Sequence, residues 1–494
     1  MLLIEEIEAG LNSKSNIFDF LSLSLFILKS RVPELIDDLT EFVCSINDNT
    51  DIHENIRSNI CKELSEPLLP FEQFDIIKGI FISACKSEID EMHQLSVLYS
   101  VLLGINSAAK FWSENSLTSW GPLDTDSKHK IRVYLRPHFT LLSSFENGVY
   151  RHRNVEFNEL IDTLDSFVFL DISELKLKRG QGVPQGKFVR PGNHNWKRGK
   201  LRVGIVPLCC DKNFEFKYTN VGINTDKAHV VYLSESEQRD FSLRAKKALQ
   251  KASKYKCNIV IFPEFTCSEQ LKDAIRDTLE ALNRRRSSVP DLVFAGTNWT
   301  SGNENVLSVF NGQGFEIGRY YKRDRYDDTD KDTGKRVYED LHNGWKEIDF
   351  YGLPGIGFIM PVICKDAMVE DGPADLFSKI FLPLLIVIPS WSPSVNSFER
   401  LTGDAKDNFT SFIMADACSA VHKEGTFSVG MSVIVTKKNT VVRGQTKEIK
   451  KKDCNLSDCN QGCLEVLEYD FKFVGRESKG DHPKHNTSVK RIEQ

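Results

Sequence analysis

Three reactive side chains follow apolar runs in the second half of the chain. Glu264 ends the run IVIFP, Lys322 follows VLSVFNGQGFEIGRYY, and Cys364 ends GFIMPVI. Taken singly, these residues have ordinary interpretations: a solvent-facing acid, a solvated lysine and a small buried hydrophobe. Taken together they could support nucleophilic catalysis by the cysteine, because a catalytic thiol needs a nearby base or cation to become a nucleophile. Their order and their surroundings therefore decide between the two interpretations.

The elements around these residues alternate between strands and helices from Leu201 onward. LRVGIVPL and CNIVIFPEF read as strands on either side of a charged helix over Ser242–Tyr255, and DLVFAGTNW, VLSVFNGQG, GIGFIMPVICKD, LLIVIPSW, MSVIVTKKN and LEVLEYDFKFV follow. Short apolar runs separated by helices predict a mostly buried sheet in a layered α/β domain. Such folds place their active sites at strand ends, where the three reactive residues stand.

The order of several short motifs carries a resemblance to a known family. FPEF, the segment from Asn305 through GFEIGRYYK, ICKD, IPSW and GMSVIV occur in that order. This series resembles the nitrilase, or carbon–nitrogen hydrolase, superfamily over about Leu201 to Phe473. The resemblance implies an αββα sandwich, with Glu264, Lys322 and Cys364 as a catalytic Glu-Lys-Cys set.

The resemblance also implies a role for each catalytic residue. Glu264 would take the thiol proton and return it to the leaving amine. Cys364 would attack the substrate carbon and form a thioester, which water activated by Glu264 would hydrolyse. Lys322 and the backbone N–H of Lys365 would stabilise the oxyanion, and the Lys322 ammonium would favour the thiolate of Cys364.

Supporting positions follow from the same resemblance. Family members often carry a second glutamate between the lysine and the cysteine, for which Glu339 in VYEDLHNG is the best match and Glu347 the runner-up. Lys365 and Asp366 stand where nitrile-cleaving members usually have an aromatic residue and a glutamate. The Cys-x-Asp form resembles the amidase branches, which favours an amide substrate over a nitrile. The lysine directly after the nucleophile, Lys365, is unusual and suggests an acidic substrate as an alternative. The charged segment Arg323–Val337 is interpreted as a solvated loop over the pocket rather than a metal site.

The first two-fifths of the chain has a different texture. Segments such as Ile17–Lys29 and Glu91–Leu103 show helical spacing of apolar residues, which predicts an all-helical module. The stretch that follows is rich in Gly, Pro, Lys and Arg and predicts a connector rather than a nucleic-acid contact. The expected domains are a helical domain over 1–177, a basic linker over 178–200, the hydrolase domain over 201–475 and a polar tail over 476–494.

Composition limits the remaining classes. The chain of 494 residues has a formal net charge of −5, which gives no electrostatic case for a nucleic-acid binder. Its start, MLLIEEIEAG, is acidic where a signal peptide is basic, and no apolar stretch of about 18 residues predicts a spanning helix. The 12 cysteines are scattered, which favours a reducing cytoplasm over a disulfide framework.

One cluster of cysteines and histidines has the residue types of a zinc site. Cys454, Cys459 and Cys463 lie within ten residues and are followed by His482 and His485. Structural zinc sites prefer tighter CxxC knuckles, so a loop with reduced cysteines before the last strand is the preferred interpretation. No metal and no organic cofactor is expected.

The leading functional hypothesis is a thiol amidohydrolase that acts on a small amide. One alternative is a regulatory or effector protein, for example in bacterial anti-phage defence, whose helical domain binds a protein partner. The other is an acyltransferase of the same superfamily, in which an amine accepts the acyl group. The resemblance further implies a homo-oligomer, and substrate identity is not determined by these motifs.

Overall fold

The structure is a computed structural model that divides the chain into two compact units. One comprises Met1–Lys178, Gln185–Phe188 and Gly475–Pro483, and the other comprises Arg179–Pro184, Val189–Val474 and Lys484–Gln494. The residues described are 7, 17–31, 50–64, 70–85, 91–112, 131–135, 167–171, 181–189, 200–208, 214–221, 226–329, 334–341, 346–353, 357–369, 372, 383–392, 398, 401–403, 410–417, 427–438, 441–451, 460–474 and 484–492.

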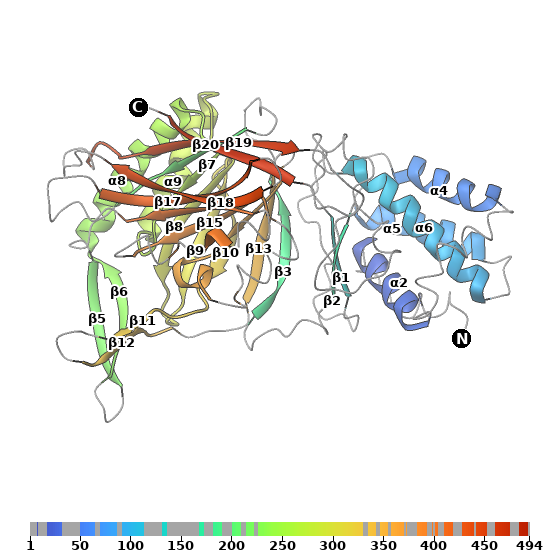
Figure 1. The fold of residues 1–494 in the computed structure, drawn as a ribbon, viewed down its shortest axis with the longest axis horizontal. Coiled ribbons are helices and arrows are strands. Elements are labelled where there is room, and N and C mark those ends of the chain that lie inside the picture. Colours follow the sequence, from blue (N-terminus) through green and yellow to red (C-terminus); the bar gives the residue numbers. More distant parts are fainter. Residues whose placement is uncertain are drawn as a thin grey trace. The chain divides into compact units, whose positions relative to one another are not determined.

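The described residues of the first unit include four helices and a strand pair. Its described elements are α2 (Ile17–Arg31), α4 (Thr50–Leu64), α5 (Pro70–Cys85), α6 (Glu91–Trp112), β1 (Ile131–Leu135) and β2 (Phe167–Asp171) (Figure 1). Phe20 of α2 packs against Phe81 of α5 with ring centroids 6.3 Å apart. β1 and β2 pair in antiparallel fashion, so the expectation of an all-helical segment is wrong here. Both IRVYL and FVFLD are rich in β-branched or aromatic residues, which favour strands.

The second unit is built on two seven-stranded sheets. The first has the order β10-β9-β8-β7-β4-β19-β20. Within it, β4, β7 and β8 run parallel, so their carboxyl ends lie at one edge. Its strands are β4 (Lys200–Ile205), β7 (Ile259–Ile261), β8 (Leu292–Trp299), β9 (Asn305–Asn311), β10 (Glu316–Tyr321), β19 (Glu465–Val474) and β20 (Lys484–Ile492).

The second sheet has the order β18-β17-β16-β15-β14-β13-β3. Here β14, β15 and β16 run parallel and again bring three carboxyl ends together. Its strands are β3 (Gln181–Phe188), β13 (Lys346–Leu353), β14 (Gly357–Pro361), β15 (Leu385–Ser390), β16 (Ser411–Asp416), β17 (Phe427–Lys438) and β18 (Val441–Lys451).

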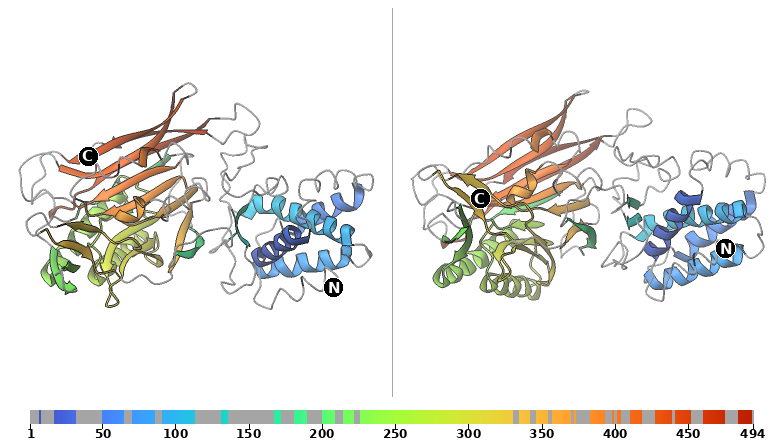
Figure 2. Two further views of the ribbon diagram at one scale, coloured as in Figure 1. Left: turned by 60° about the horizontal axis from the view of Figure 1, so that its bottom comes forward. Right: turned by 90° about the horizontal axis from the view of Figure 1, so that it is seen from below.

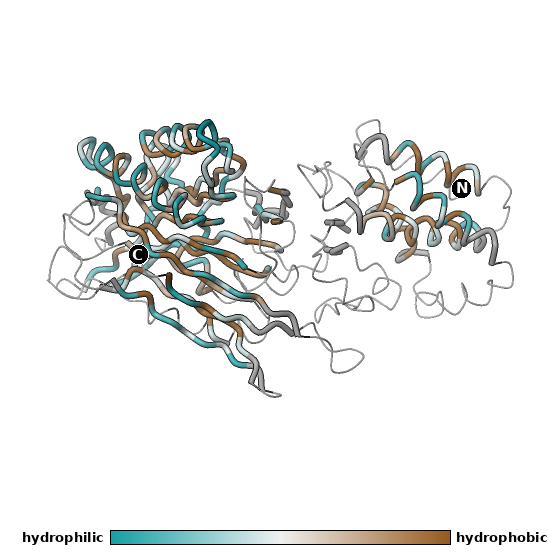
Figure 3. Tube along the Cα trace, turned by 90° about the horizontal axis from the view of Figure 1, so that it is seen from above, coloured by the Kyte–Doolittle hydropathy of each residue, from teal (hydrophilic) through white to brown (hydrophobic). Residues whose placement is uncertain are grey.

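The two sheets pack face to face, and helices cover the first one. Phe294 of β8 meets Tyr351 of β13 with ring centroids 6.1 Å apart, and Ser432 of β17 hydrogen-bonds Tyr469 of β19 at 2.7 Å. Helices α8 (Glu235–Lys254) and α9 (Glu269–Arg284) lie on the other face of the first sheet (Figures 2 and 3). The described residues do not test the second helical layer, on the second sheet, that an αββα sandwich implies.

A third, four-stranded sheet adjoins the sandwich. Its order is β11-β12-β6-β5, and β12 pairs in parallel with β6. The strands are β5 (Phe214–Val221), β6 (Asp226–Leu233), β11 (Asp327–Thr329) and β12 (Arg336–Glu339). The segment expected to be a solvated loop over Arg323–Val337 therefore contributes two paired strands, although β11 is exposed along its length.

Two expected boundaries also change. The linker expected over 178–200 contains β3, which is a strand of the second sheet. The polar tail expected over 476–494 contains β20, which pairs with β19 along its whole length. Charged and polar residues alternate with Thr487 and Val489 in β20, a pattern that an edge strand tolerates. Among the described residues, no helix is long and apolar enough to span a membrane.

Candidate active site

Glu264 stands on a tight turn at the carboxyl end of β7. The next residue, Phe265, has a left-handed φ of 64°, and its N–H donates to Thr297 Oγ1 at 2.9 Å. The neighbouring strand β8 has a bulge at Gly296, whose φ is 75°. A Cβ at this position would lie 2.2 Å from the carbonyl oxygen of Pro263. A glycine is required at this close approach, and the bulge holds the turn that presents Glu264.

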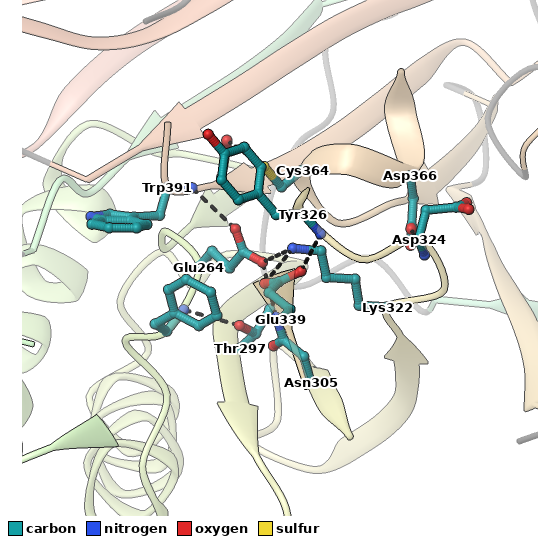
Figure 4. Close-up of polar contacts among 12 residues, drawn as sticks. Glu264, Thr297, Asn305, Lys322, Asp324, Tyr326, Glu339, Cys364, Asp366 and Trp391 are labelled. Carbon is teal, nitrogen blue, oxygen red and sulfur yellow. Dashed lines mark hydrogen bonds and ion pairs between the residues drawn. The ribbon is translucent and has the colours of Figure 1, made fainter. Parts of the chain in front are cut away.

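Three donors hold the Glu264 carboxylate. Oε1 accepts from Lys322 Nζ at 2.8 Å and from Asn305 Nδ2 at 2.9 Å, while Oε2 accepts the backbone N–H of Trp391 at 3.2 Å. Figure 4 shows these contacts converging beside Cys364. Burial raises the pKa of Glu264 and the Glu339 charge raises it further, which outweighs the lowering by Lys322 and Asn305. The residue is thus a buried carboxylate with an increased affinity for a proton.

Lys322 lies between two buried carboxylates. It follows β10, where its backbone N–H donates to the carbonyl of Asn305 at 2.9 Å. Its Nζ donates to Glu264 Oε1 at 2.8 Å and to Glu339 Oε1 at 2.7 Å, and it lies 5.9 Å from the centre of the Phe265 ring. Burial lowers its pKa, but the two carboxylates raise it more, so the pKa ends well above the ordinary lysine value. Lys322 is therefore a permanent ammonium ion.

Glu339 connects Lys322 to the four-stranded sheet. It is the last residue of β12 and is 1% exposed. Its Oε2 accepts the N–H of Tyr326 at 2.7 Å, and its own N–H donates to the Tyr326 carbonyl at 3.0 Å. The structure thus brings Glu339 into the cluster with Glu264 and Lys322. The runner-up, Glu347, lies in β13, and its side chain is outside the described residues.

Cys364 occupies a strained turn after β14. Its φ is 40°, a left-handed value that is costly for a residue with a Cβ. The side chain is 5% exposed, and the Ser390 hydroxyl donates to Sγ at 3.3 Å. Burial raises the thiol pKa and the Glu264 charge raises it further, against a lowering by Lys322 and Ser390. The resting group is accordingly a protonated thiol rather than a standing thiolate.

The two residues after Cys364 differ sharply in their environments. Lys365 is partly exposed, whereas Asp366 is fully buried. Burial raises the pKa of Asp366 to about 7, and the nearby Asp324 carboxylate adds to the rise. The Asp366 carboxylate contacts the turn that follows β10, and it lies to the side of the Glu264–Lys322–Glu339 cluster (Figure 4).

Sequence reasoning missed several residues of this cluster. The sequence motif gives Asn305 no role of its own, yet its amide supports Glu264 from the start of β9. Ser390 and Trp391 follow the apolar run of β15 and supply a hydroxyl and a backbone N–H. An Asn or Ser at the end of a fully buried strand is the signal that could have identified them. Tyr326 was hidden in a charged segment; its ring lies beside Cys364 in Figure 4 and is 36% exposed.

Among the described residues, no group of three or more His, Cys, Asp or Glu side chains could hold a metal. Cys463 is described and buried, His485 lies in β20, and Cys454, Cys459 and His482 lie outside the described residues. The question of zinc at this cluster therefore stays with the sequence interpretation.

The arrangement as a whole can support nucleophilic chemistry at sulfur. A protonated thiol lies beside a buried carboxylate of raised pKa, and a permanent ammonium lies between that carboxylate and a second one. A carboxylate of this kind can accept the thiol proton as attack occurs, and the ammonium can stabilise negative charge that develops on a substrate oxygen.

Comparisons with known proteins give likenesses of fold only. No protein-family model and no curated protein matches the chain. Saccharomyces cerevisiae Nit3, a member of branch 10 of the nitrilase superfamily, matches at 14% identity over 51% of this chain and 90% of its own, with a TM-score of 0.31. The C. elegans NitFhit protein matches at 15% identity over 51% of this chain and 62% of its own, with a TM-score of 0.33. A mutant of the Nesterenkonia AN1 amidase matches at 14% identity over 54% and 96% of the two chains, with a TM-score of 0.32. The chain is thus similar in structure, over about half its length, to members of the nitrilase superfamily.

Proposed function

We propose that this protein is a thiol amidohydrolase that cleaves the carbon–nitrogen bond of a small amide. The observation that carries the proposal is the pairing of a buried thiol on a strained turn with the buried Glu264–Lys322–Glu339 cluster. Burying such charges is costly, so a cluster of this kind calls for a reason beyond stability. Perturbed ionisable groups gathered around a nucleophile are typical of active sites.

In the first half-reaction, Glu264 acts as the general base. The Cys364 thiol gives its proton to Glu264 while Sγ bonds to the amide carbon, whose oxygen becomes an oxyanion. The Lys322 ammonium stabilises that oxyanion, together with the backbone N–H of Lys365 on the turn that carries Cys364. Collapse of the intermediate breaks the carbon–nitrogen bond, and the proton on Glu264 moves to the departing nitrogen. The products are a thioester on Cys364 and a free amine or ammonia.

In the second half-reaction, water replaces the amine. Glu264 takes a proton from water while the water oxygen bonds to the thioester carbon, and the same donors stabilise the second oxyanion. Collapse then breaks the carbon–sulfur bond, and the proton returns from Glu264 to Sγ. One amide and one water thus yield one carboxylic acid and one amine, and the enzyme returns to its starting state.

The ionisation states favour this base-coupled route. Burial raises the pKa of Cys364 above its ordinary value, so little thiolate exists before substrate binds. Burial also raises the pKa of Glu264, which makes that carboxylate a better proton acceptor near neutral pH than an exposed glutamate. Attack therefore depends on proton transfer to Glu264, and removal of the carboxylate is expected to be as damaging as removal of the thiol.

Amide turnover by matched variants tests the proposal. Wild type, Cys364→Ala, Glu264→Gln and a Cys257→Ala control are incubated with a panel of small amides, and release of ammonia or amine is measured. Cys257 is also a fully buried cysteine, but it lies in the hydrophobic core with α8 rather than in the cluster. We expect turnover in wild type and Cys257→Ala and none in the other two. Equal turnover by wild type and Cys364→Ala would contradict the assignment.

A further inference from the structure

Asp366 makes a set of contacts that the proposed chemistry does not use. It stands two residues after Cys364 and has no measurable exposure. Its Oδ2 accepts the Tyr320 hydroxyl at 2.8 Å, and its Oδ1 accepts the Asp324 N–H at 2.7 Å. The Arg323 N–H lies 3.1 Å from both oxygens. Both oxygens of this carboxylate are thus engaged with one short stretch of chain.

That stretch is the turn that carries Lys322. Tyr320 precedes the lysine by two residues, and Arg323 and Asp324 follow it directly, so Asp366 contacts the chain on both sides of Lys322. The contact also crosses between layers of the sandwich. β10, which leads to Lys322, belongs to the first sheet, whereas Cys364 and Asp366 follow β14 of the second.

We propose that Asp366 is a positioning residue that fixes the Lys322 turn against the Cys364 turn. The inference rests on the proposed function, because it assigns Asp366 a role in setting the distance between the ammonium and the thiol. Two catalytic groups that come from different sheets need such a tether, since a displacement of about 1 Å can reduce a rate by about a hundredfold. Asp366 does not touch the reacting atoms and acts through Lys322.

The ionisation of Asp366 supports a tether that responds to pH. Burial and the Asp324 charge raise its pKa to about 7, while hydrogen bonds from Asp324 N–H and Tyr320 and the charge of Lys322 oppose the rise. The Arg323 charge also acts on Tyr320 in this group. As pH falls through about 7, the carboxylate takes up a proton and one acceptor site becomes a donor, which weakens its hold on the N–H groups.

Three variants separate positioning from simple stabilisation. Asp366→Ala removes every contact, whereas Asp366→Asn keeps one acceptor oxygen and the size of the side chain. Asp349→Ala is the matched control. Asp349 is also a buried aspartate that links the second sheet to β10, since it accepts the Arg319 N–H at 3.2 Å and the Tyr351 hydroxyl at 3.3 Å. It contacts β10 before the Lys322 turn.

The first readout is the apparent pKa of the Cys364 thiol in the full-length protein. It is obtained from the pH dependence of Cys364 alkylation by iodoacetamide, followed by mass spectrometry. We expect Asp366→Ala to raise this apparent pKa by as much as Lys322→Met does. Asp366→Asn, which resembles the protonated carboxyl, should raise it by a smaller amount, and Asp349→Ala should leave it unchanged. In the Lys322→Met background, Asp366→Ala should have no further effect, because its influence passes through the lysine.

The second readout is hydrogen exchange at the amides of Arg323 and Asp324. Asp366→Ala should speed their exchange at least tenfold, and Asp349→Ala should not. The proposal is overturned if Asp366→Ala changes neither the apparent pKa of Cys364 nor the amide exchange rates. It is also overturned if the pKa changes caused by Asp366→Ala and Lys322→Met are fully additive, or if Asp349→Ala raises the Cys364 pKa as much as Asp366→Ala does. A different result is that hydrogen exchange at Arg323 and Asp324 speeds up as expected, but Lys322→Met does not change the apparent pKa of Cys364. In that case the proposed catalytic role of the cluster fails, and the positioning role of Asp366 fails with it.

Discussion

Removal of the Lys322 ammonium tests how the buried cluster is held together. Lys322→Met keeps an unbranched apolar stem and deletes the charge that separates Glu264 from Glu339. The ammonium lies 2.8 Å and 2.7 Å from the two carboxylates, and all three side chains are at most 2% exposed. Loss of one partner from such a buried group leaves uncompensated charge, which costs about 3–5 kcal/mol. The second unit of Lys322→Met should be less stable than wild type by that amount at pH 8.

The cost should depend on pH, with a definite sign. The folded-state pKa of Glu264 is already raised by burial, and loss of the Lys322 charge raises it further. A carboxyl with a raised folded pKa retains its proton in the folded state at pH values where the unfolded chain has lost it. Stability of the variant therefore falls as pH rises above the ordinary glutamate pKa, by about 1.4 kcal/mol per pH unit for each such proton. Below that range the penalty should be smallest.

The assay is native-state hydrogen exchange of the β7 and β8 amides between pH 5 and pH 8, which reports on the second unit alone. Lys272→Met is the matched control, because Lys272 pairs at 2.8 Å with Glu269, whose side chain is 79% exposed. A surface pair of this kind contributes at most about 1 kcal/mol. A smaller loss of stability in Lys322→Met than in its control at pH 8 would rule out a charge-compensating role for Lys322, and so would an equal loss at both ends of the pH range.

Three further predictions concern neighbouring positions. Gly296→Ala should destabilise the second unit by about 2 kcal/mol or more in urea unfolding, because its φ is 75° and the new Cβ would lie 2.2 Å from the Pro263 oxygen. Glu339→Gln should cost about 1–3 kcal/mol at pH 8 by the same method, since Lys322 loses one of its two charged partners. The pKa of Asp366 is about 7, so its burial penalises folding increasingly from about pH 4 to pH 7. Asp366→Asn should remove that pH-dependent fall from the stability profile; an unchanged slope would contradict the shift.

The proximity of the proposed catalytic residues was the feature most readily predicted from sequence. Glu264, Lys322 and Cys364 each follow a short apolar run, and buried strands of a layered fold end at a common edge. The structure places Glu264 and Lys322 in direct contact and Cys364 beside them. The glycine that follows Glu339 favours it over Glu347, and in the structure Lys322 Nζ donates to Glu339.

The parts that sequence patterns missed depend on pairing between distant segments. β12 pairs with β6 across more than a hundred residues, and no local periodicity reveals such a partner. β20 reads as a polar tail because it is an edge strand, and most of its side chains are charged or polar. The contacts of Asp366 are hidden for the same reason. Its donors are mainly backbone N–H groups on a turn, which carry no sequence signature.

The proposed thioester on Cys364 can be captured and identified. The protein is mixed with an activated acyl ester, p-nitrophenyl acetate, quenched in acid and analysed by peptide mass spectrometry. We expect one acetyl group on Cys364 in wild type, none on that peptide in Cys364→Ala, and loss of the adduct over time as water hydrolyses the thioester. An unmodified Cys364, or equal acetylation of the other buried cysteines, would contradict the proposed thioester mechanism.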